Sequence, residues 1–167
     1  MPEDACLPYV HSGGSFELLY RREYPNLIAV ARALTGDRHD GEDLVQDTMV
    51  KAFVKWDRIR LYQKPGGWCL RVLTHACRDH WSRGRTRARF MARQRPIEPS
   101  SEGPGVEFVA FWQAVRRLPE RPRLVVTLYY AGDRSIADVA SIVKVPEGTV
   151  KSDLARARTV LMTEMER

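Results

Sequence analysis

A stretch near the C-terminus, RSIADVASIVKVPEGTVKSDLARAR, constrains the fold most, because its pattern fits two short helices joined by a tight turn. Ser135 precedes the first helix, and Asp138 three residues later completes a pattern close to a capping box. Pro146 follows the break, since proline can begin a helix but cannot continue one. Apolar residues recur at helical spacing: Ile136, Val139, Ala140 and Val143, then Val150, Leu154, Ala157 and Leu161. The sequence therefore predicts a helix-turn-helix unit.

The opposite face of the second helix combines small residues with hydrogen-bond donors. Its members are Gly148, Lys151, Ser152, Ala155 and Arg156. Small residues let a backbone approach closely, and Lys, Ser and Arg donate to phosphates and base edges. This layout is typical of a recognition helix that enters the DNA major groove. An αα-hairpin that only packs, with a solvated charged face, is the alternative that pattern alone leaves open.

Charge and length narrow the classes of partner. The chain has 167 residues, a formal net charge of +6 and a pI of about 9.5. A basic balance favours an anionic partner, nucleic acid first and an anionic membrane surface second. No apolar run reaches the length of a membrane span, and the N-terminus lacks the pattern of a secretory signal. We expect a cytoplasmic protein without membrane insertion.

The rest of the chain also shows helical periodicity, with no alternating strand pattern, so we expect an all-α protein. Pro25 should bend or interrupt the first helix, and Asp40 should cap the second. The fourth helix should bury Val109, Trp112 and Val115. The expected helices before the helix-turn-helix span residues 15–35, 41–56, 68–85, 106–118 and 121–131.

The second expected helix begins with a run of acidic residues. Carboxylates in a first helical turn suit the helix dipole, which is the purely structural explanation. That explanation does not account for Gln46, Asp47 and Val50 pointing outward further along. A mixed polar and apolar outer face in a basic protein suggests a docking surface for another protein.

The third expected helix ends in a dense run of arginines: Arg78, Arg83, Arg85, Arg87, Arg89, Arg93 and Arg95. Trp81 and Phe90 are interleaved with them, and Asp79 is the acidic residue among them. Such a run can simply be solvated, but with aromatic residues between the arginines it is the pattern expected of a nucleic-acid surface.

Residues 94–105 are rich in proline, glycine and serine, which predicts a linker. We therefore expect two small helical domains joined by a flexible linker: a loose tail at 1–14, a first domain at 15–93 and a second domain at 106–167.

The sequence offers no pattern for catalysis. It has no Gly-rich phosphate loop, serine elbow or Cys-x-x-Cys pair, so we expect neither an enzyme nor a cofactor. Cys69, His75, Cys77 and His80 share one helix, but His75 and Cys77 face different ways at helical spacing. We expect no metal site, and we interpret Cys69 and Cys77 as core residues and His80 as a polar group beside DNA. Cys6 is the third cysteine of the chain. The three cysteines are not clustered in the sequence, which argues against disulfides.

From Phe16 to Leu161 the chain resembles the extracytoplasmic-function sigma factors, promoter-specificity subunits of bacterial RNA polymerase. LTGDRHDGEDLVQDTMVKAF and GGWCLRVLTHACRDHWSR resemble region 2 of that family, and LPERPRLVVTLYYAGDRSIADVASIVKVPEGTVKSDLARART resembles region 4. The combination of an acidic helix with a C-terminal helix-turn-helix makes the resemblance specific.

The resemblance implies three surfaces and their partners. Core RNA polymerase, through its β′ clamp helices, would bind Asp43, Gln46, Asp47 and Phe53, and the β flap would be a second contact. The −10 element of promoter DNA would be read and melted by Tyr62, Lys64, Trp68, Arg78, Asp79, Trp81 and Arg85. The −35 element would be read by Gly148, Thr149, Lys151, Ser152, Arg156 and Arg158. The linker would thread toward the polymerase active-site and RNA-exit channel, and an anti-sigma factor would cover both DNA surfaces.

Two positions depart from the family pattern. Lys144 stands where relatives have a glycine in the turn, so we expect a less regular turn, since a non-glycine residue at positive φ is strained. Asp153 stands where relatives have a basic residue, so its carboxylate would accept from a cytosine amine or lie away from the DNA backbone. The competing function is a free-standing helix-turn-helix regulator, which would leave the acidic surface without a role.

Overall fold

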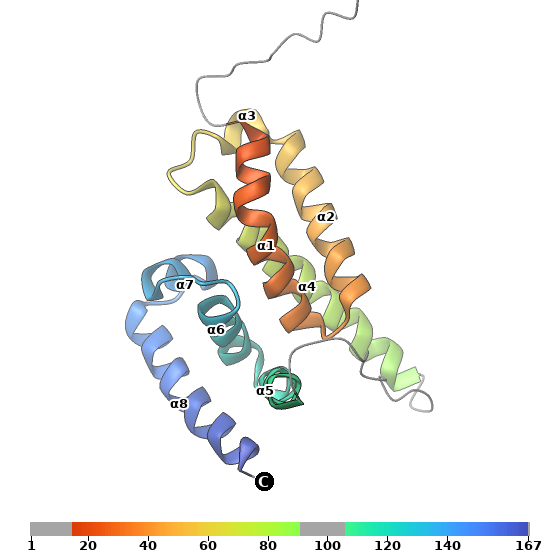
Figure 1. Cartoon of the computed structure of the whole chain (residues 1–167), viewed down its shortest axis with the longest axis vertical. Coiled ribbons are helices and arrows are strands. Elements are labelled where there is room, and N and C mark those ends of the chain that lie inside the picture. The colour runs from red at the N-terminus through yellow and green to blue at the C-terminus, as the bar shows by residue number, and fades with distance from the viewer. Residues whose placement is uncertain (1–14, 91–105, 167) are drawn as a thin grey trace, which may run out of the picture.

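The computed structural model describes residues 15–90 and 106–166, and within them the regular structure is entirely helical. Helices α1 to α4 form one half of the molecule and α5 to α8 the other (Figure 1). This agrees with the expected all-α fold, whereas the expected tail and linker lie outside the described residues. The helices are α1 Phe16–Thr35, α2 Arg38–Val54, α3 Trp56–Ile59, α4 Pro65–Phe90, α5 Val106–Arg117, α6 Glu120–Tyr130, α7 Ile136–Val143 and α8 Glu147–Met165.

The first half is organised around α1, which packs against both α2 and α4. The Ser15 side chain accepts from the Leu18 amide to cap α1, and Gly36 ends it in the left-handed conformation at φ 73°. Pro25 lies inside α1 without interrupting it, so the expected interruption is wrong: the surrounding turns and packing hold the helix despite the missing N–H. The core of this half includes Leu27, Val45, Leu70 and Leu73.

The start of α2 differs from the sequence expectation for a local reason. The Asp37 side chain accepts from the Asp40 amide at 2.9 Å, so Asp37 is the N-cap and Asp40 lies in the first turn. The expected cap at Asp40 is therefore wrong by three residues. The short helix α3 was not expected, and α4 begins at Pro65, a residue type suited to a first helical position.

The second half contains the expected helix-turn-helix in α7 and α8. The Ser135 side chain accepts from the Asp138 amide at 3.1 Å, which confirms the cap. The four apolar positions of α8 (Val150, Leu154, Ala157 and Leu161) are all buried, as expected. Trp112 and Val115 of α5 are also buried, but Val109 is 38% exposed, so its expected place in the core is wrong.

Lys144 ends α7 in the left-handed conformation, with φ 60° and ψ 52°. The turn therefore keeps the regular left-handed cap, and the expectation of a less regular turn is wrong. The backbone N–H of Lys144 donates to the Ala140 carbonyl, which satisfies a helix-end acceptor. A lysine is sterically strained in this conformation, whereas a glycine would not be.

Replacing this lysine should stabilise the protein. We expect Lys144→Gly to raise the free energy of unfolding by about 1 kcal/mol, because the strain disappears while the cap hydrogen bond stays. Urea unfolding followed by circular dichroism measures the change. Lys151→Gly is the matched control: it removes an exposed lysine from inside α8 and should lower stability by about 1 kcal/mol. A loss of stability in Lys144→Gly would contradict the strain argument.

Asp153 lies on the inner side of α8, away from the exposed face. Its carboxylate accepts from Nε and Nη2 of Arg121 on α6, at 2.7 and 3.2 Å. The alternative in which Asp153 reads a cytosine is therefore wrong, and the alternative in which it lies away from DNA agrees with the structure. The two-point pair ties α6 to α8 and so positions the recognition helix.

Removing the two partners of this pair should have unequal effects. Arg121→Ala leaves the Asp153 carboxylate buried without its partner, so we expect the melting temperature to fall by roughly 5 °C or more. Asp153→Ala leaves Arg121, whose side chain is 51% exposed, to be solvated, so the fall should be clearly smaller. Thermal unfolding of both variants measures the difference, and equal losses would contradict this account.

Candidate nucleic-acid and docking surfaces

The exposed face of α8 presents the residues expected to read DNA. Gly148, Lys151, Ser152 and Arg156 are exposed, and Thr149 is half-buried. No other group lies within 4 Å of a Cβ built at Gly148, so the backbone is open there to a close approach. Ser152 donates to the Gly148 carbonyl at 2.9 Å, and exposed Arg158 donates to the Tyr130 hydroxyl at 2.9 Å. The structure thus brings together the residues expected at the −35 element.

The second expected DNA surface is arranged differently, because its side chains contact the C-terminal half. Arg78 of α4 is paired with Glu120 of α6, and the Arg123 guanidinium lies 3.7 Å from the centroid of the Trp81 ring. The Trp81 indole N–H also donates to the Leu34 carbonyl at 3.1 Å. These residues lie at the junction between the halves.

The other members of this surface vary in exposure. Tyr62 and Asp79 are exposed, while Trp68 is half-buried and packs against the core. Exposed Lys64 donates to Asp138 of α7 at 2.5 Å, and this bond together with one from Ser135 lowers the pKa of the Asp138 carboxyl. Arg85 lies on α4, and its side chain is outside the described part of the chain.

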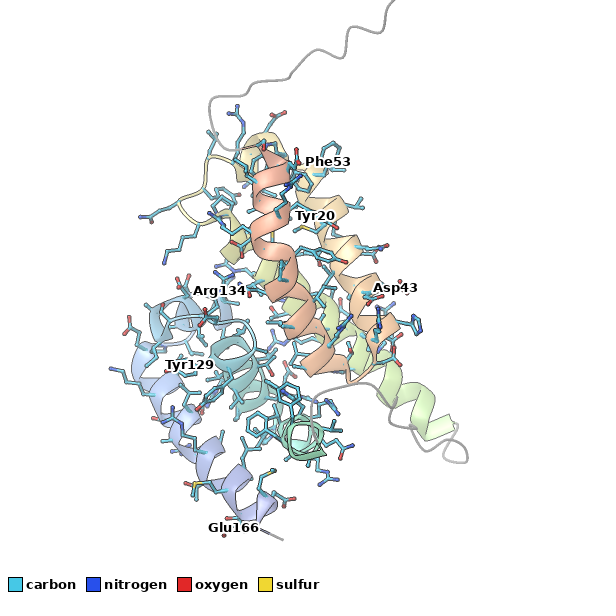
Figure 2. The ribbon with its side chains drawn as sticks, in the orientation of Figure 1. Tyr20, Asp43, Phe53, Tyr129, Arg134 and Glu166 are labelled. Carbon is cyan, nitrogen blue, oxygen red and sulfur yellow. The ribbon has the colours of Figure 1, made fainter. Side chains whose placement is uncertain are left out.

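The outer face of α2 is exposed, and α2 packs mainly against α1 and α4. Asp43, Gln46 and Asp47 are exposed, as the sequence predicted for a docking surface. Figure 2 shows Asp43 and Phe53 on α2, away from the C-terminal half. Phe53 is 64% exposed, and its ring lies 5.2 Å from that of Phe16.

The apolar part of this face is larger than the sequence predicted: Val50 and Phe53 were expected there, but Leu18, Val54 and Leu61 were not. Several large apolar side chains are exposed around the C-terminal end of α2: Leu18, Val50, Phe53, Val54 and Leu61. An exposed apolar patch beside charged residues is typical of a protein-binding surface. Helical periodicity within α2 could have indicated Val54, whereas Leu18 and Leu61 lie outside α2 and join the patch only through packing.

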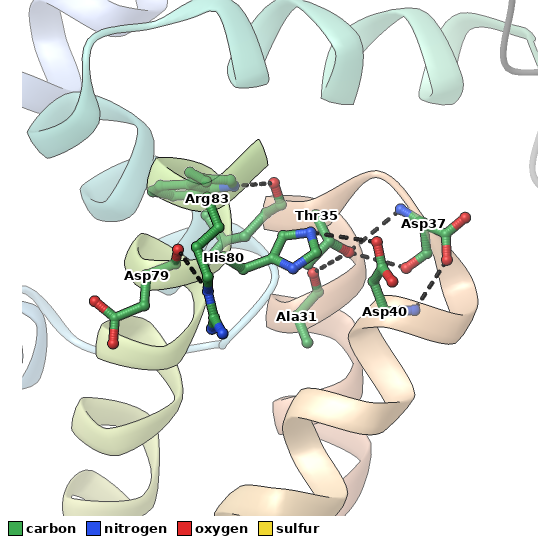
Figure 3. A network of polar contacts seen from close by, with 9 residues as sticks. Ala31, Thr35, Asp37, Asp40, Asp79, His80 and Arg83 are labelled. Atoms are coloured by element: carbon green, nitrogen blue, oxygen red, sulfur yellow. Dashed lines mark hydrogen bonds and ion pairs between the residues drawn. The ribbon is translucent and has the colours of Figure 1, made fainter. Parts of the chain in front are cut away.

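A polar network fixes the corner between α1, α2 and α4 (Figure 3). His80 Nε2 lies 3.2 Å from an Asp40 carboxylate oxygen, and the Thr35 hydroxyl donates to the carbonyls of Ala31 and Asp37, both at 2.9 Å. These contacts hold the acidic start of α2 against the middle of α4.

Cys69 and Cys77 are completely buried, which confirms their interpretation as core residues. Burial raises the pKa of each thiol to about 12, so neither forms a nucleophilic thiolate near neutral pH. His75, by contrast, is exposed. Among residues 15–90 and 106–166, no group of three or more His, Cys, Asp or Glu side chains is placed to hold a metal ion. In the same ranges no helix has the length and apolar character needed to cross a membrane.

The fold and these surfaces define a helix-turn-helix protein with a second helical domain that carries an acidic and apolar face. Residues 19–87 match the family model for sigma-70 region 2, and residues 108–161 match that for sigma-70 region 4. The chain is 33% identical to the ECF RNA polymerase sigma factor SigM of Mycobacterium tuberculosis over 95% of this chain and 82% of the relative. This chain therefore belongs to the ECF sigma factors of the sigma-70 family, which direct RNA polymerase to promoters.

Two further relatives agree with this assignment. The RNA polymerase sigma-E factor of Streptomyces avermitilis is 29% identical over 90% of this chain and 85% of its own length. The sigma factor RpoE of Bartonella quintana, solved in complex with the anti-sigma factor NepR, is 28% identical, with a TM-score of 0.71 over 90% of this chain and 96% of that one. A match over both halves at this score supports the two-domain fold.

Proposed function

We propose that this sigma factor binds core polymerase through α2 and contacts the promoter through two separate surfaces. This proposal depends on the position of the surfaces: the acidic and apolar face of α2 is exposed, while the DNA-reading candidates lie on α4, on the loop before it and on α8. Residues 15–93 and 106–167 act as two domains joined by 94–105, and the protein does no chemistry of its own. It works in the cytoplasm, where polymerase and promoters meet.

The proposed polymerase contact combines charge with burial of apolar surface. Asp43, Gln46 and Asp47 pair with polar groups on the β′ clamp helices, and Phe53 inserts among apolar side chains there. Charged groups at such a contact orient the partners, while a buried aromatic ring contributes most of the affinity. The β flap is the second polymerase contact, made by the C-terminal half.

The proposed promoter contacts divide by domain. Gly148, Thr149, Lys151, Ser152 and Arg156 read the −35 element in the major groove, and Arg158 contacts phosphate. Tyr62, Lys64, Trp68, Arg78, Asp79, Trp81 and Arg85 read and melt the −10 element. Stacking of an aromatic ring on an unpaired base is worth roughly 1–3 kcal/mol, which offsets much of the cost of unstacking it.

An anti-sigma factor is the proposed regulatory partner. The Bartonella quintana relative was solved with such a protein bound, and the fold similarity extends over both halves. A protein that covers both DNA-reading surfaces would keep this sigma factor from the promoter.

Polymerase association distinguishes this function from that of a free-standing regulator. The purified chain should co-purify with core polymerase and support run-off transcription from a cognate promoter. Tight binding to duplex promoter DNA without any association with β′ would exclude a sigma factor and favour the regulator.

A further inference from the structure

We propose that the free protein masks its own −10 surface: the C-terminal half occupies the side chains of the first half that would bind promoter DNA. This inference rests on the proposed promoter contacts and adds a regulatory step to them. The occupant of the surface is a part of the same chain, seen in place in Figure 1 as α6 and α7 against α1 and α4.

The masking is direct because three candidates for −10 recognition each contact the other half. Lys64 pairs with Asp138, Arg78 pairs with Glu120, and Trp81 lies under the guanidinium of Arg123. A phosphate or a base would need the same ammonium, guanidinium or ring face. DNA binding at these positions and the contact between the halves therefore exclude each other.

The centre of the contact is a buried ion pair between Glu23 of α1 and Arg134, which lies between α6 and α7. Nη2 of Arg134 lies 2.5 Å from the Glu23 carboxylate, whose side chain is only 5% exposed. Figure 2 shows Arg134 at the junction of the halves. Arg22 also donates to this carboxylate, from Nε at 2.9 Å, but the Arg22 side chain is 68% exposed. The pair with Arg134 is buried and little screened by salt, so its loss weakens the contact between the halves while Glu23 keeps Arg22 as a partner.

Glu23 also contacts the first turn of α4. A Cβ added at Gly66 would lie 2.4 Å from the Glu23 carboxylate, so the glycine lets this turn lie directly on Glu23. The loop just before this turn carries Tyr62 and Lys64, two of the candidates for −10 recognition. One carboxylate thus links the start of α4, next to the DNA-reading loop, to the C-terminal half.

The outer contacts are weaker, which makes the masking reversible. Lys64 is 67% exposed, and Arg78 and Glu120 are each 42% exposed, so solvent screens both pairs. A groove of about 1200 Å³ remains between the loop and α7, lined by charged side chains of both halves such as Arg60, Arg71 and Asp133. Polyanionic DNA can displace such pairs by offering phosphates to the same cations.

The test compares −10 DNA binding by the isolated full chain and three variants. Glu23→Gln, Arg134→Ala and Glu120→Ala each break one contact between the halves, and the last two lie in the C-terminal half. We expect each to bind a single-stranded −10 oligonucleotide about fivefold to twentyfold more tightly, because the binding-competent open state becomes more populated. Glu17→Ala, which breaks the exposed Glu17–Arg21 pair on α1, should leave affinity unchanged.

A second measurement reports closure independently of affinity. A carbodiimide should join the Lys64 amine to the Asp138 carboxylate, which lie 2.5 Å apart, and mass spectrometry of the digest detects the joined peptides. We expect saturating −10 oligonucleotide, or Arg134→Ala, to lower this yield at least about fivefold. Parental affinity in all three variants, or a yield that DNA leaves unchanged, would overturn the proposal. Neither result bears on polymerase association, which tests the sigma function separately.

Discussion

Asp47→Lys should weaken binding to core polymerase about thirtyfold or more, which corresponds to about 2 kcal/mol. Asp47 is exposed on the outer face of α2, so the change should leave the fold intact while it reverses the charge offered to the β′ clamp helices. Fluorescence anisotropy with labelled protein measures the affinity, and run-off transcription at limiting protein should fall in parallel.

The control for this variant keeps the charge change and moves it elsewhere. Asp57→Lys replaces a carboxylate on α3 that is 93% exposed, and polymerase affinity should stay within about twofold. Unchanged transcription from Asp47→Lys would leave the acidic face without a role. The free-standing regulator would then be the better account of this chain.

Affinity for a −35 duplex should fall about a thousandfold between roughly 50 and 200 mM salt, if about six phosphates are neutralised. The cause is counterion release, since each protein cation on a phosphate frees a condensed ion from the DNA. Binding isotherms of the full chain at several salt concentrations measure the slope of the logarithm of affinity against the logarithm of salt concentration.

Single variants test which residues contribute to this slope. Arg158→Ala should lower its magnitude by about one, because the proposed role of Arg158 is to contact a phosphate. Asp153→Asn should leave the slope unchanged, because that carboxylate is buried against Arg121 and faces away from DNA. A flat response to salt in the parent chain would contradict the assignment of a basic DNA surface.

Most individual helices could be predicted because their signals are local. Ser135 and Asp138 define a cap three residues apart, and the apolar stripe of α8 repeats within each turn. One error arose where two local signals competed: Asp37 and Asp40 both suit an N-cap, and only the packed structure selects Asp37. Lys144 was expected to disturb the turn, but the helix-end hydrogen bond holds it in the left-handed conformation.

The candidate surfaces divide in the same way. Exposure of Asp43, Asp47 and Lys151 follows from helical periodicity, so the sequence predicted the outer faces of α2 and α8. It did not predict that Trp81 and Arg78 would contact the C-terminal half, because helical periodicity carries no information about residues far away in the sequence.

By itself, the sequence determined the all-helical composition, the helix-turn-helix and the two basic regions, because those depend on neighbours within about four residues. Only the tertiary structure decided that the halves contact each other and which cations are occupied. Lys64 and Asp138 are 74 positions apart, and Glu23 and Arg134 are 111 apart. Pairs at such separations leave no periodic trace in the chain, since packing of the helices alone brings them together.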